Sequence, residues 1–402
     1  MTSLKFDSVF NSVFATASFP RLRSGVNFFK IGSEINSCMY VGFSHRGIEL
    51  ESESAKRLLQ LLDGSHTLEK IYKLLTKNIN GTNCDDGEIA RSEIAEILKL
   101  LSREQLIEFR TSQLVTFVEG EFAPVNLISS VNKMRAEENL YCWHPAVSID
   151  RSSESLITSR RNFAIIIFGR NRLALSLFSI LQASGFSQVK IIDRSISAAS
   201  AALVQIAPDE VCGLAIRGSD VGMRKASVIA DLARNSQLFP AQDSTFPTVP
   251  DFIISTETIP QETLQRWMSE EIAHLAISNL IENKVEIGPI VLPGKSPCLN
   301  CLNLWRSEQY PHHKEFELIA ALDSAHVKSL ELPSAQVALL SGIIAIHVIE
   351  FCATRNAPDQ IAPDQNHTEL VGATQSINLF DPMANQYRYW QPHIACGCQR
   401  LI

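Results

Sequence analysis

Several sequence signals are absent from this chain of 402 residues, and each absence excludes a class of protein. Residues 1–30 contain no uninterrupted apolar stretch, because polar residues such as Lys5 and Asp7 break it, so no secretory signal is expected. The longest apolar region, Val337 to Val348, contains two polar residues and is too short to span a membrane. No lipidation motif is present. We therefore expect a cytoplasmic protein with no membrane partner.

The charge balance excludes a further class. The net charge of −7 argues against general nucleic-acid binding. No internal repeat or extended low-complexity segment is present, and 45% hydrophobic with 20% charged residues is ordinary for a soluble globular protein. The length predicts two or three domains. Nine cysteines in a cytosolic chain favour thiols or metal ligands over disulfides.

The stretch from Phe163 to Asp193 organises the rest of the chain. Six apolar residues end at Phe168, and a short turn, an amphipathic run and a second apolar run follow. Asp193 comes directly after that second run. The order strand, turn, helix, strand, acid is typical of a nucleotide-binding βαβ unit, in which the turn faces phosphates and the acid reaches a ribose hydroxyl.

The turn departs from the nucleotide-binding pattern at one informative position. A G-x-G-x-x-G/A turn would place glycine at 169 and 171 and a small residue at 174, and this chain has Gly169, Asn171 and Ala174. The second glycine lets a pyrophosphate approach the backbone, and here that position carries a side chain. Asparagine tolerates unusual backbone angles, so the turn can form. The pattern predicts a doubly wound α/β core that has lost its nucleotide.

Before this core, residues 30–110 have the pattern of a small α+β module. Two short strands are predicted at Cys38–Gly42 and Gly47–Leu50, with residues 1–30 irregular. Three helices follow, and the third carries Ile94, Ile97 and Leu101; a strand at Leu106–Phe109 closes the module. This order resembles a winged-helix domain. Residues 111–160 are compositionally mixed and are interpreted as a connecting region.

After the core, alternating strand and helix patterns continue a parallel sheet. The predicted strands lie at Val211–Ile216, Asp251–Ser255 and Ala273–Ser278, and the predicted helices at Asp220–Arg234 and Pro260–Met268. Later strands at Val285–Leu292 and Glu369–Asn378 are expected to be antiparallel, and Ser334–Cys352 is expected to be a long buried helix.

Four cysteines form two close pairs. Cys298 and Cys301 make a C-x2-C, and Cys396 and Cys398 make a C-x-C. A tetrahedral zinc takes four thiolates, and each short pair can supply two adjacent corners. The spacing predicts a structural zinc that ties the C-terminal segment to the sheet. A redox-active C-x2-C and unrelated buried thiols are the alternatives.

Together these features resemble the ThiF-type superfamily, in which a Rossmann-like core carries a zinc held by four cysteines. The segment Gly288–Gly294 before the C-x2-C and the pair Pro392-His393 before the C-x-C resemble one branch more closely. That branch contains the ThiF-like leader-peptide-binding proteins of azole-forming, YcaO-associated peptide biosynthesis. Residues 30–110 are similar to its N-terminal PqqD-like domain. The resemblance implies a winged-helix, PqqD-like domain over 1–110, a connecting region over 111–160 and a ThiF-like domain with the zinc site over 161–402.

The resemblance also implies which residues would meet a nucleotide. Asp193 matches the ribose acid, and Lys225 matches the lysine of a D-x-G-x-x-K pattern that begins at Asp220. The family's Asn-x-x-Arg pair is missing from Ser195 to Gln205. Its magnesium-binding aspartate is replaced by Thr258, or at best by Glu257. Loss of this carboxylate argues against ATP and magnesium binding, because carboxylates are the usual magnesium ligands.

We therefore expect a non-catalytic protein, with no catalytic residue, that binds a precursor peptide and presents it to a YcaO-type cyclodehydratase. A homodimer is expected. The alternative is an ATP-dependent adenylating enzyme that acts on a carboxylate, and a nicotinamide-dependent oxidoreductase is disfavoured because no hydride-transfer site is evident.

The peptide is expected to pair with a strand edge of the first module. Ile94, Ile97 and Leu101 are the predicted pocket walls, unless they only fill the module's own core. A winged helix could instead bind DNA, but the third helix carries glutamates such as Glu93 and Glu96 rather than a basic stripe.

Overall fold

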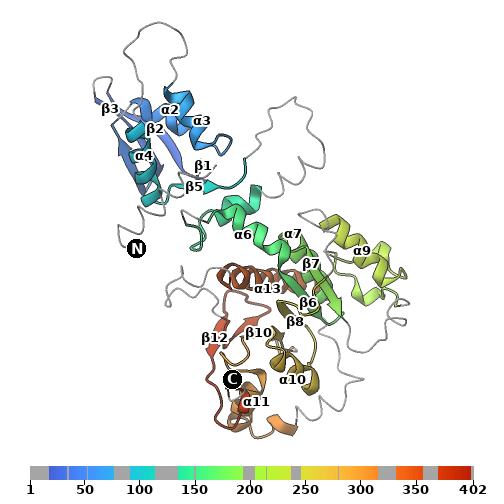
Figure 1. The fold of residues 1–402 in the computed structure, drawn as a ribbon. Coiled ribbons are helices and arrows are strands. Elements are labelled where there is room, and N and C mark those ends of the chain that lie inside the picture. The colour runs from blue at the N-terminus through green and yellow to red at the C-terminus, as the bar shows by residue number, and fades with distance from the viewer. Residues whose placement is uncertain are drawn as a thin grey trace. The chain divides into compact units, whose positions relative to one another are not determined.

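A computed structural model describes most of the chain, and it divides into two compact units, Met1–Ser159 and Arg160–Ile402 (Figure 1). Each unit is described by itself. The residues described are 18–33, 36–51, 53–76, 91–113, 135–148, 151–192, 204–213, 215–236, 246–278, 280–315, 332–355 and 370–399.

The first unit contains a three-stranded antiparallel sheet in the order β2-β3-β4. Its strands are β2 (Asn27–Ser33), β3 (Asn36–Phe43) and β4 (Arg46–Leu50). The two predicted strands are confirmed as β3 and β4, but the expectation that residues 1–30 are irregular is wrong, because β2 begins there and pairs with β3 along its whole length. β3 is therefore central, and β4 is an edge strand of this sheet.

A second pair of strands closes the unit. β1 (Phe19–Leu22) also lies in the segment expected to be irregular, and it pairs antiparallel with β5 (Ile107–Arg110). Sequence reasoning missed β1 because its four residues include a proline and an arginine, Pro20 and Arg21. Such a short polar strand has no periodicity of its own and forms only through its partner.

Three helices cover the sheet. They are α2 (Glu53–Leu61), α3 (Leu68–Thr76) and α4 (Arg91–Arg103), as predicted. Thr67 accepts a hydrogen bond from the Lys70 backbone N–H, which caps α3. The apolar faces of the helices meet Met39, Val41 and Leu50 of the sheet in one core. The winged-helix assignment itself stays a prediction.

Buried charges attach the later part of the unit to the β1–β5 pair. Arg21 donates to Glu108 at 2.5 Å, and Arg110 donates to Glu138 at 2.5 Å. Residues 135–141 are helical, and Glu138 lies on that helix. Ser153, the first residue of α6 (Ser153–Ser159), donates its backbone N–H and its hydroxyl to Glu108. All five residues are buried, so their charges and polar groups satisfy one another away from water.

The second unit is built on a seven-stranded mixed sheet, which confirms the α/β prediction. The strand order is β12-β11-β10-β9-β8-β6-β7. The strands are β6 (Ala164–Phe168), β7 (Gln188–Ile192), β8 (Phe252–Ser255), β9 (Ala273–Ile277), β10 (Lys284–Val291), β11 (Ala373–Asn378) and β12 (Gln386–Tyr389). β7, β6, β8 and β9 run parallel, whereas β10, β11 and β12 are antiparallel, as the two later strand segments were predicted to be.

Helices pack on both faces of this sheet. α7 (Arg172–Ala183) and the 22-residue α13 (Ser334–Arg355) pack against one another. Phe351 of α13 lies on Phe163, which directly precedes β6, and on Phe252 of β8, at ring separations of 6.3 and 4.8 Å. On the opposite face, α10 (Gln261–Ser269) packs Leu264 and Trp267 against Phe168 and Ile253. α13 is long and apolar enough to cross a bilayer, yet its many buried residues are those of a core helix.

One predicted strand is wrong. Val211–Ile216 forms no strand in its described residues, because Cys212 and Gly213 both donate their backbone N–H to Ile216 and so close a tight loop. Its apolar residues are nevertheless buried against Leu175 and Val228, which explains the apolar pattern. The remaining helices are α9 (Lys225–Ser236), α11 (Leu299–Gln309) and the short 3-10 turns at Arg160–Asn162, Pro208–Glu210, Gly218–Asp220 and Gly397–Gln399.

Candidate functional site

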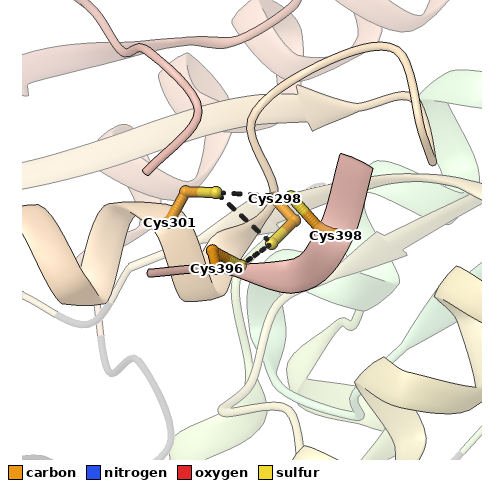
Figure 2. Close-up of side chains that lie close together, drawn as sticks. All are labelled: Cys298, Cys301, Cys396 and Cys398. Carbon is orange, nitrogen blue, oxygen red and sulfur yellow. Dashed lines mark hydrogen bonds between the residues drawn. The ribbon is translucent and has the colours of Figure 1, made fainter. Parts of the chain in front are cut away.

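The two cysteine pairs converge at one point of the second unit (Figure 2). Cys298 precedes the first turn of α11 and Cys301 lies within it, whereas Cys396 and Cys398 come from the segment after β12. The sulfur atoms of Cys298 and Cys396 lie 3.5 Å apart, and those of Cys301 and Cys398 lie 3.4 Å apart. The predicted convergence of the pairs, across nearly a hundred residues of sequence, is therefore present in the fold.

The geometry of the four sulfurs fits a tetrahedral metal. A zinc bound at about 2.3 Å from each sulfur requires sulfur-to-sulfur distances of about 3.8 Å. The Cys298 to Cys301 distance is 3.8 Å, and all four sulfurs lie within 4.8 Å of one another. The donor set is all thiol and mostly buried, which suits a structural zinc with no open coordination position. The cluster could bind a metal ion and is compatible with zinc.

The thiols of the cluster differ in their affinity for protons. Burial raises the pKa of Cys298 well above its ordinary value and raises the pKa of Cys398 to about 11. For Cys396 burial acts in the same direction, but hydrogen bonds from the Asn300 side chain and the Cys398 backbone outweigh it and lower its pKa. Burial therefore favours the protonated form of Cys298 and Cys398, and a metal must displace these two protons to bind.

The nearby histidine of the C-terminal segment has a different partner. His393 is buried, and its Nε2 lies 3.0 Å from Glu308 of α11. Its ring packs edge-on against Trp305 at 4.7 Å. Among the described residues, the group of side chains that could bind a metal ion consists of the four cysteines and contains no histidine. His393 therefore stabilises the segment that carries Cys396 rather than completing the cluster.

The second candidate region is the turn between β6 and α7, where nucleotide contacts were predicted. Gly169 has a φ of +127°, and a Cβ built there would lie 2.3 Å from the Thr256 hydroxyl oxygen and 3.2 Å from the Glu257 carboxyl carbon. Glycine is required at this position, because the loop after β8 lies directly against its α-carbon. The loop after β8 thus occupies the space beside Gly169 in which a phosphate lies in a nucleotide-binding turn.

Asn171 is the N-cap of α7, and it is only 5% exposed. Its side-chain oxygen accepts a hydrogen bond from Ala174 N–H at 2.9 Å, and its amide nitrogen donates to the Thr256 carbonyl at 2.9 Å. Both groups of the amide are therefore engaged inside the protein. The residue that replaces the second glycine of the pattern holds the turn to the loop after β8.

The backbone of Arg170 and the side chain of Lys225 are also paired within the protein. The Arg170 backbone N–H donates to the Glu257 carboxylate at 2.9 Å. The Lys225 ammonium donates to the Arg170 carbonyl at 2.7 Å and to Glu210 at 2.5 Å, and Lys225 is only 5% exposed. Asp193, the predicted ribose acid, lies outside the described residues. The predicted nucleotide residues that are described come together in space, but they bond to the protein itself.

Glu257 and Glu210 were the residues that sequence reasoning missed in these roles. Glu257 lies 87 positions after Arg170, and Glu210 lies 15 positions before Lys225. Local spacing carries no signal for the first contact. From the sequence, Glu257 was considered only as a possible magnesium ligand.

The predicted peptide-pocket residues lie in the core of the first unit. Ile94, Ile97 and Leu101 are 0%, 7% and 0% exposed, and they pack with the sheet and the other helices. Their burial gives them little surface for a peptide, in line with the alternative that they fill the module's own core. Any peptide contact of the unit has to be built mainly on other groups.

Comparison with known proteins gives fold likenesses and no family. No family description matches the sequence, and no curated protein is significantly similar to it. Among solved structures, E. coli MccB with MccA-N7isoASN is similar at 14% identity and a TM-score of 0.53, over 94% of this chain and 99% of that one. A structure described as the microcin C7 biosynthetic enzyme MccB with N-formylated MccA matches at 12% identity, a TM-score of 0.53 and the same coverage.

The heterocyclase TruD is similar at 11% identity and a TM-score of 0.53. The likeness covers 95% of this chain but only 42% of TruD. At these identities the comparisons show that the fold is shared with MccB and with part of TruD.

Proposed function

We propose that this protein binds a ribosomally made precursor peptide and presents it to a partner cyclodehydratase, without carrying out chemistry itself. The observation that carries the proposal is the likeness to MccB across nearly the whole of both chains, because structures of MccB are described as complexes with MccA. MccA is a peptide in that system. The shared fold supports a peptide-handling role for this chain within the biosynthesis of modified peptides.

The edge strand β4 is the proposed place for the peptide. The two-residue loop between Phe43 and Arg46 makes these residues a hydrogen-bonded pair, and such pairs alternate along an antiparallel ladder. Gly47 and Glu49 then direct their backbone N–H and C=O groups away from β3. An extended peptide can pair with these groups, which supplies affinity that is independent of side chains. Ile48 packs on the edge of the core and offers a partly exposed apolar contact.

The closed turn between β6 and α7 supports a non-catalytic role. An adenylating enzyme must bring ATP phosphates to this turn, and here Glu257 and Lys225 already satisfy its backbone groups. The adenylating alternative keeps one argument in its favour, because MccB has also been described in complex with ATP. Calorimetry with magnesium and ATP separates the two functions. We expect no saturable binding, and a micromolar dissociation constant would favour the enzyme.

The likeness to TruD supports a partner enzyme. The likeness covers 42% of the TruD chain, which is described as a heterocyclase. We propose that the partner of this chain is a YcaO-type cyclodehydratase in the cytoplasm. With zinc bound, the cysteine cluster would hold the C-terminal segment to the sheet. We also propose that the protein is a homodimer. Ile94, Ile97 and Leu101 would lie beneath the peptide site.

The peptide site can be tested on the full chain with a matched pair of variants. Glu49→Pro removes the outward backbone N–H of β4, and Glu49→Ala keeps it. Fluorescence anisotropy with a labelled candidate precursor peptide should show binding to the wild type and to Glu49→Ala. Glu49→Pro should lose at least tenfold in affinity, which is about 1.4 kcal/mol. Equal binding by both variants would exclude this edge, and circular dichroism checks that each variant is folded.

A further inference from the structure

The described part of the chain contains one place where a carboxylate of the protein lies on a backbone group that nucleotide-binding folds reserve for phosphate. That place is the turn between β6 and α7. We propose that Glu257 is an internal ligand of this turn, and that its carboxylate closes an anion position which the backbone still forms. The inference rests on the proposed non-catalytic function and adds the group that keeps the nucleotide out.

Two separate observations place the carboxylate at the turn. Its oxygen accepts the Arg170 backbone N–H at 2.9 Å, and this amide lies at the start of α7, where the helix dipole favours negative charge. Its carboxyl carbon would lie 3.2 Å from a Cβ on Gly169, so it lies at the face of the glycine that the Thr256 hydroxyl also approaches. An anion and a glycine face are the two elements of a phosphate-binding turn, and Glu257 supplies the anion.

The loop that carries Glu257 is held in place from both sides. Thr256 donates its backbone N–H to the Phe168 carbonyl at 3.0 Å, and its own carbonyl accepts from Asn171 at 2.9 Å. The Ser255 hydroxyl donates to the Glu257 carbonyl at 2.7 Å. The carboxylate is therefore presented by an ordered loop, which reduces the entropy that an internal ligand loses on binding.

The positively charged side chain at the turn, Lys225, is also paired with groups of the protein. Lys225 would meet phosphates in an active relative, and here its ammonium lies between the Arg170 carbonyl and the Glu210 carboxylate. An incoming anion must displace Glu257 from the amide and compete with Glu210 for the ammonium. Removal of Glu257 alone frees the Arg170 amide, while the Thr256 hydroxyl stays against Gly169 and Lys225 stays in its pair.

The test compares Glu257→Gln and Glu257→Ala with Glu262→Gln, which changes an exposed carboxylate on the neighbouring helix α10. The probe is inorganic pyrophosphate, measured by calorimetry on the full chain, with sodium chloride at matched ionic strength as the blank. Glu257→Ala should bind pyrophosphate roughly tenfold to a hundredfold more tightly than the wild type, as expected for the exchange of one charge-assisted hydrogen bond. Glu262→Gln should behave as the wild type.

Thermal unfolding gives a second readout that does not depend on high affinity. Glu257→Ala should melt lower than the wild type, because the Arg170 amide loses its partner, and pyrophosphate should restore part of that loss in this variant alone. Glu257→Gln keeps an oxygen acceptor without the charge and should fall between the two. Equal pyrophosphate binding by wild type and Glu257→Ala, or no binding and no thermal rescue in the variant, would overturn the proposal. Neither result would alter peptide binding at β4, so failure here is distinguishable from failure of the proposed function.

Discussion

The cysteine cluster and the nucleotide-type turn belong to the same unit, and their polar groups are satisfied in opposite ways. In the cluster, four thiols lie within 4.8 Å of one another, and burial raises the pKa of Cys298 and Cys398 and so favours their neutral form. In the turn, the Arg170 backbone, the Asn171 side-chain amide and the Lys225 ammonium each have a hydrogen-bond partner within the protein. The first arrangement could bind a metal ion and is compatible with zinc, whereas the named groups of the second already bond to the protein.

The difference shows how a candidate ligand site can be distinguished from a site-like turn whose groups already bond to the protein. Residue identity alone makes both regions look like sites, because both carry residues that resemble family positions. The arrangement of partners separates them. Four thiols that converge on one point could bind a metal ion, whereas donors and acceptors that pair with one another leave fewer groups for a ligand.

The largest effect should come from breaking the cluster. Cys298→Ser removes one of four ligands, so the zinc content of purified protein should fall from one per chain to near zero, with a loss of stability on the order of several kcal/mol. Elemental analysis and thermal unfolding measure the two effects. Cys212→Ser changes a buried thiol outside the cluster and should keep the metal. Unchanged zinc in Cys298→Ser would refute the site.

The closed turn should respond differently to loss of its cation. Lys225→Met leaves the Glu210 carboxylate and the Arg170 carbonyl without their partner, so the free energy of unfolding should fall by about 3 kcal/mol while zinc content stays the same. Chemical denaturation measures the loss. Lys284→Met, an exposed lysine on β10, is the control. Replacing Glu210 by leucine in the Lys225→Met background should recover part of the loss, because an apolar pair avoids the uncompensated charge.

His274 offers a third arrangement, a buried group with neither ligand nor full pairing. Its Nδ1 bonds to the Ile272 carbonyl at 2.9 Å, whereas its Nε2 is buried without a partner among the described residues. Burial lowers its pKa from 6.5 to about 4. The unfolded chain therefore takes up a proton below pH 6.5 and the folded chain does not, so stability should be intact above pH 6.5 and fall by up to about 3 kcal/mol towards pH 4.

Denaturation at a series of pH values tests this dependence, with His274→Leu as the comparison. The variant should be less sensitive to pH between 6.5 and 4, since the proton uptake of the unfolded chain at this residue is removed. The same slope in both proteins would assign the acid sensitivity to other groups.

The smallest effect should follow from restoring the missing glycine. Asn171→Gly removes the cap of α7 and the bond to the Thr256 carbonyl, at a cost of about 1 kcal/mol. It should not restore ATP binding, because Glu257 and Lys225 remain paired. ATP binding by this variant in calorimetry would show that the asparagine alone had closed the turn.

The sequence predicts the strands and helices well, but it predicts contacts between residues that are distant in sequence poorly. The strands and helices from β6 to α13 follow from apolar periodicity, because each element buries a regular face. The four cysteines are also predictable, because two short spacings fix the geometry of each pair before the fold brings the pairs together. Val211–Ile216 was predicted as a strand because it is apolar and buried, but burial by a tight loop leaves the same pattern.

The missed features depend on partners that are distant in sequence. β1 exists through its pairing with β5, and Glu257 meets Arg170 across 87 positions. A glutamate beside a strand end has many possible roles, and only the fold selects one. The closed state of the turn could therefore not be read from Asn171 and Thr258 alone.

The buried charges of the first unit have a consequence for the newborn chain. Synthesis delivers Arg21 early, but its acidic partners Glu108 and Glu138 follow much later. A nascent chain that is stalled after Arg21 but before Glu108 contains the arginine without its acidic partners. In such a chain β1 also lacks β5, the strand with which it pairs. Such an intermediate would expose its core helices to chaperones and proteases, and translation past α6 supplies the last contacts that end this exposure.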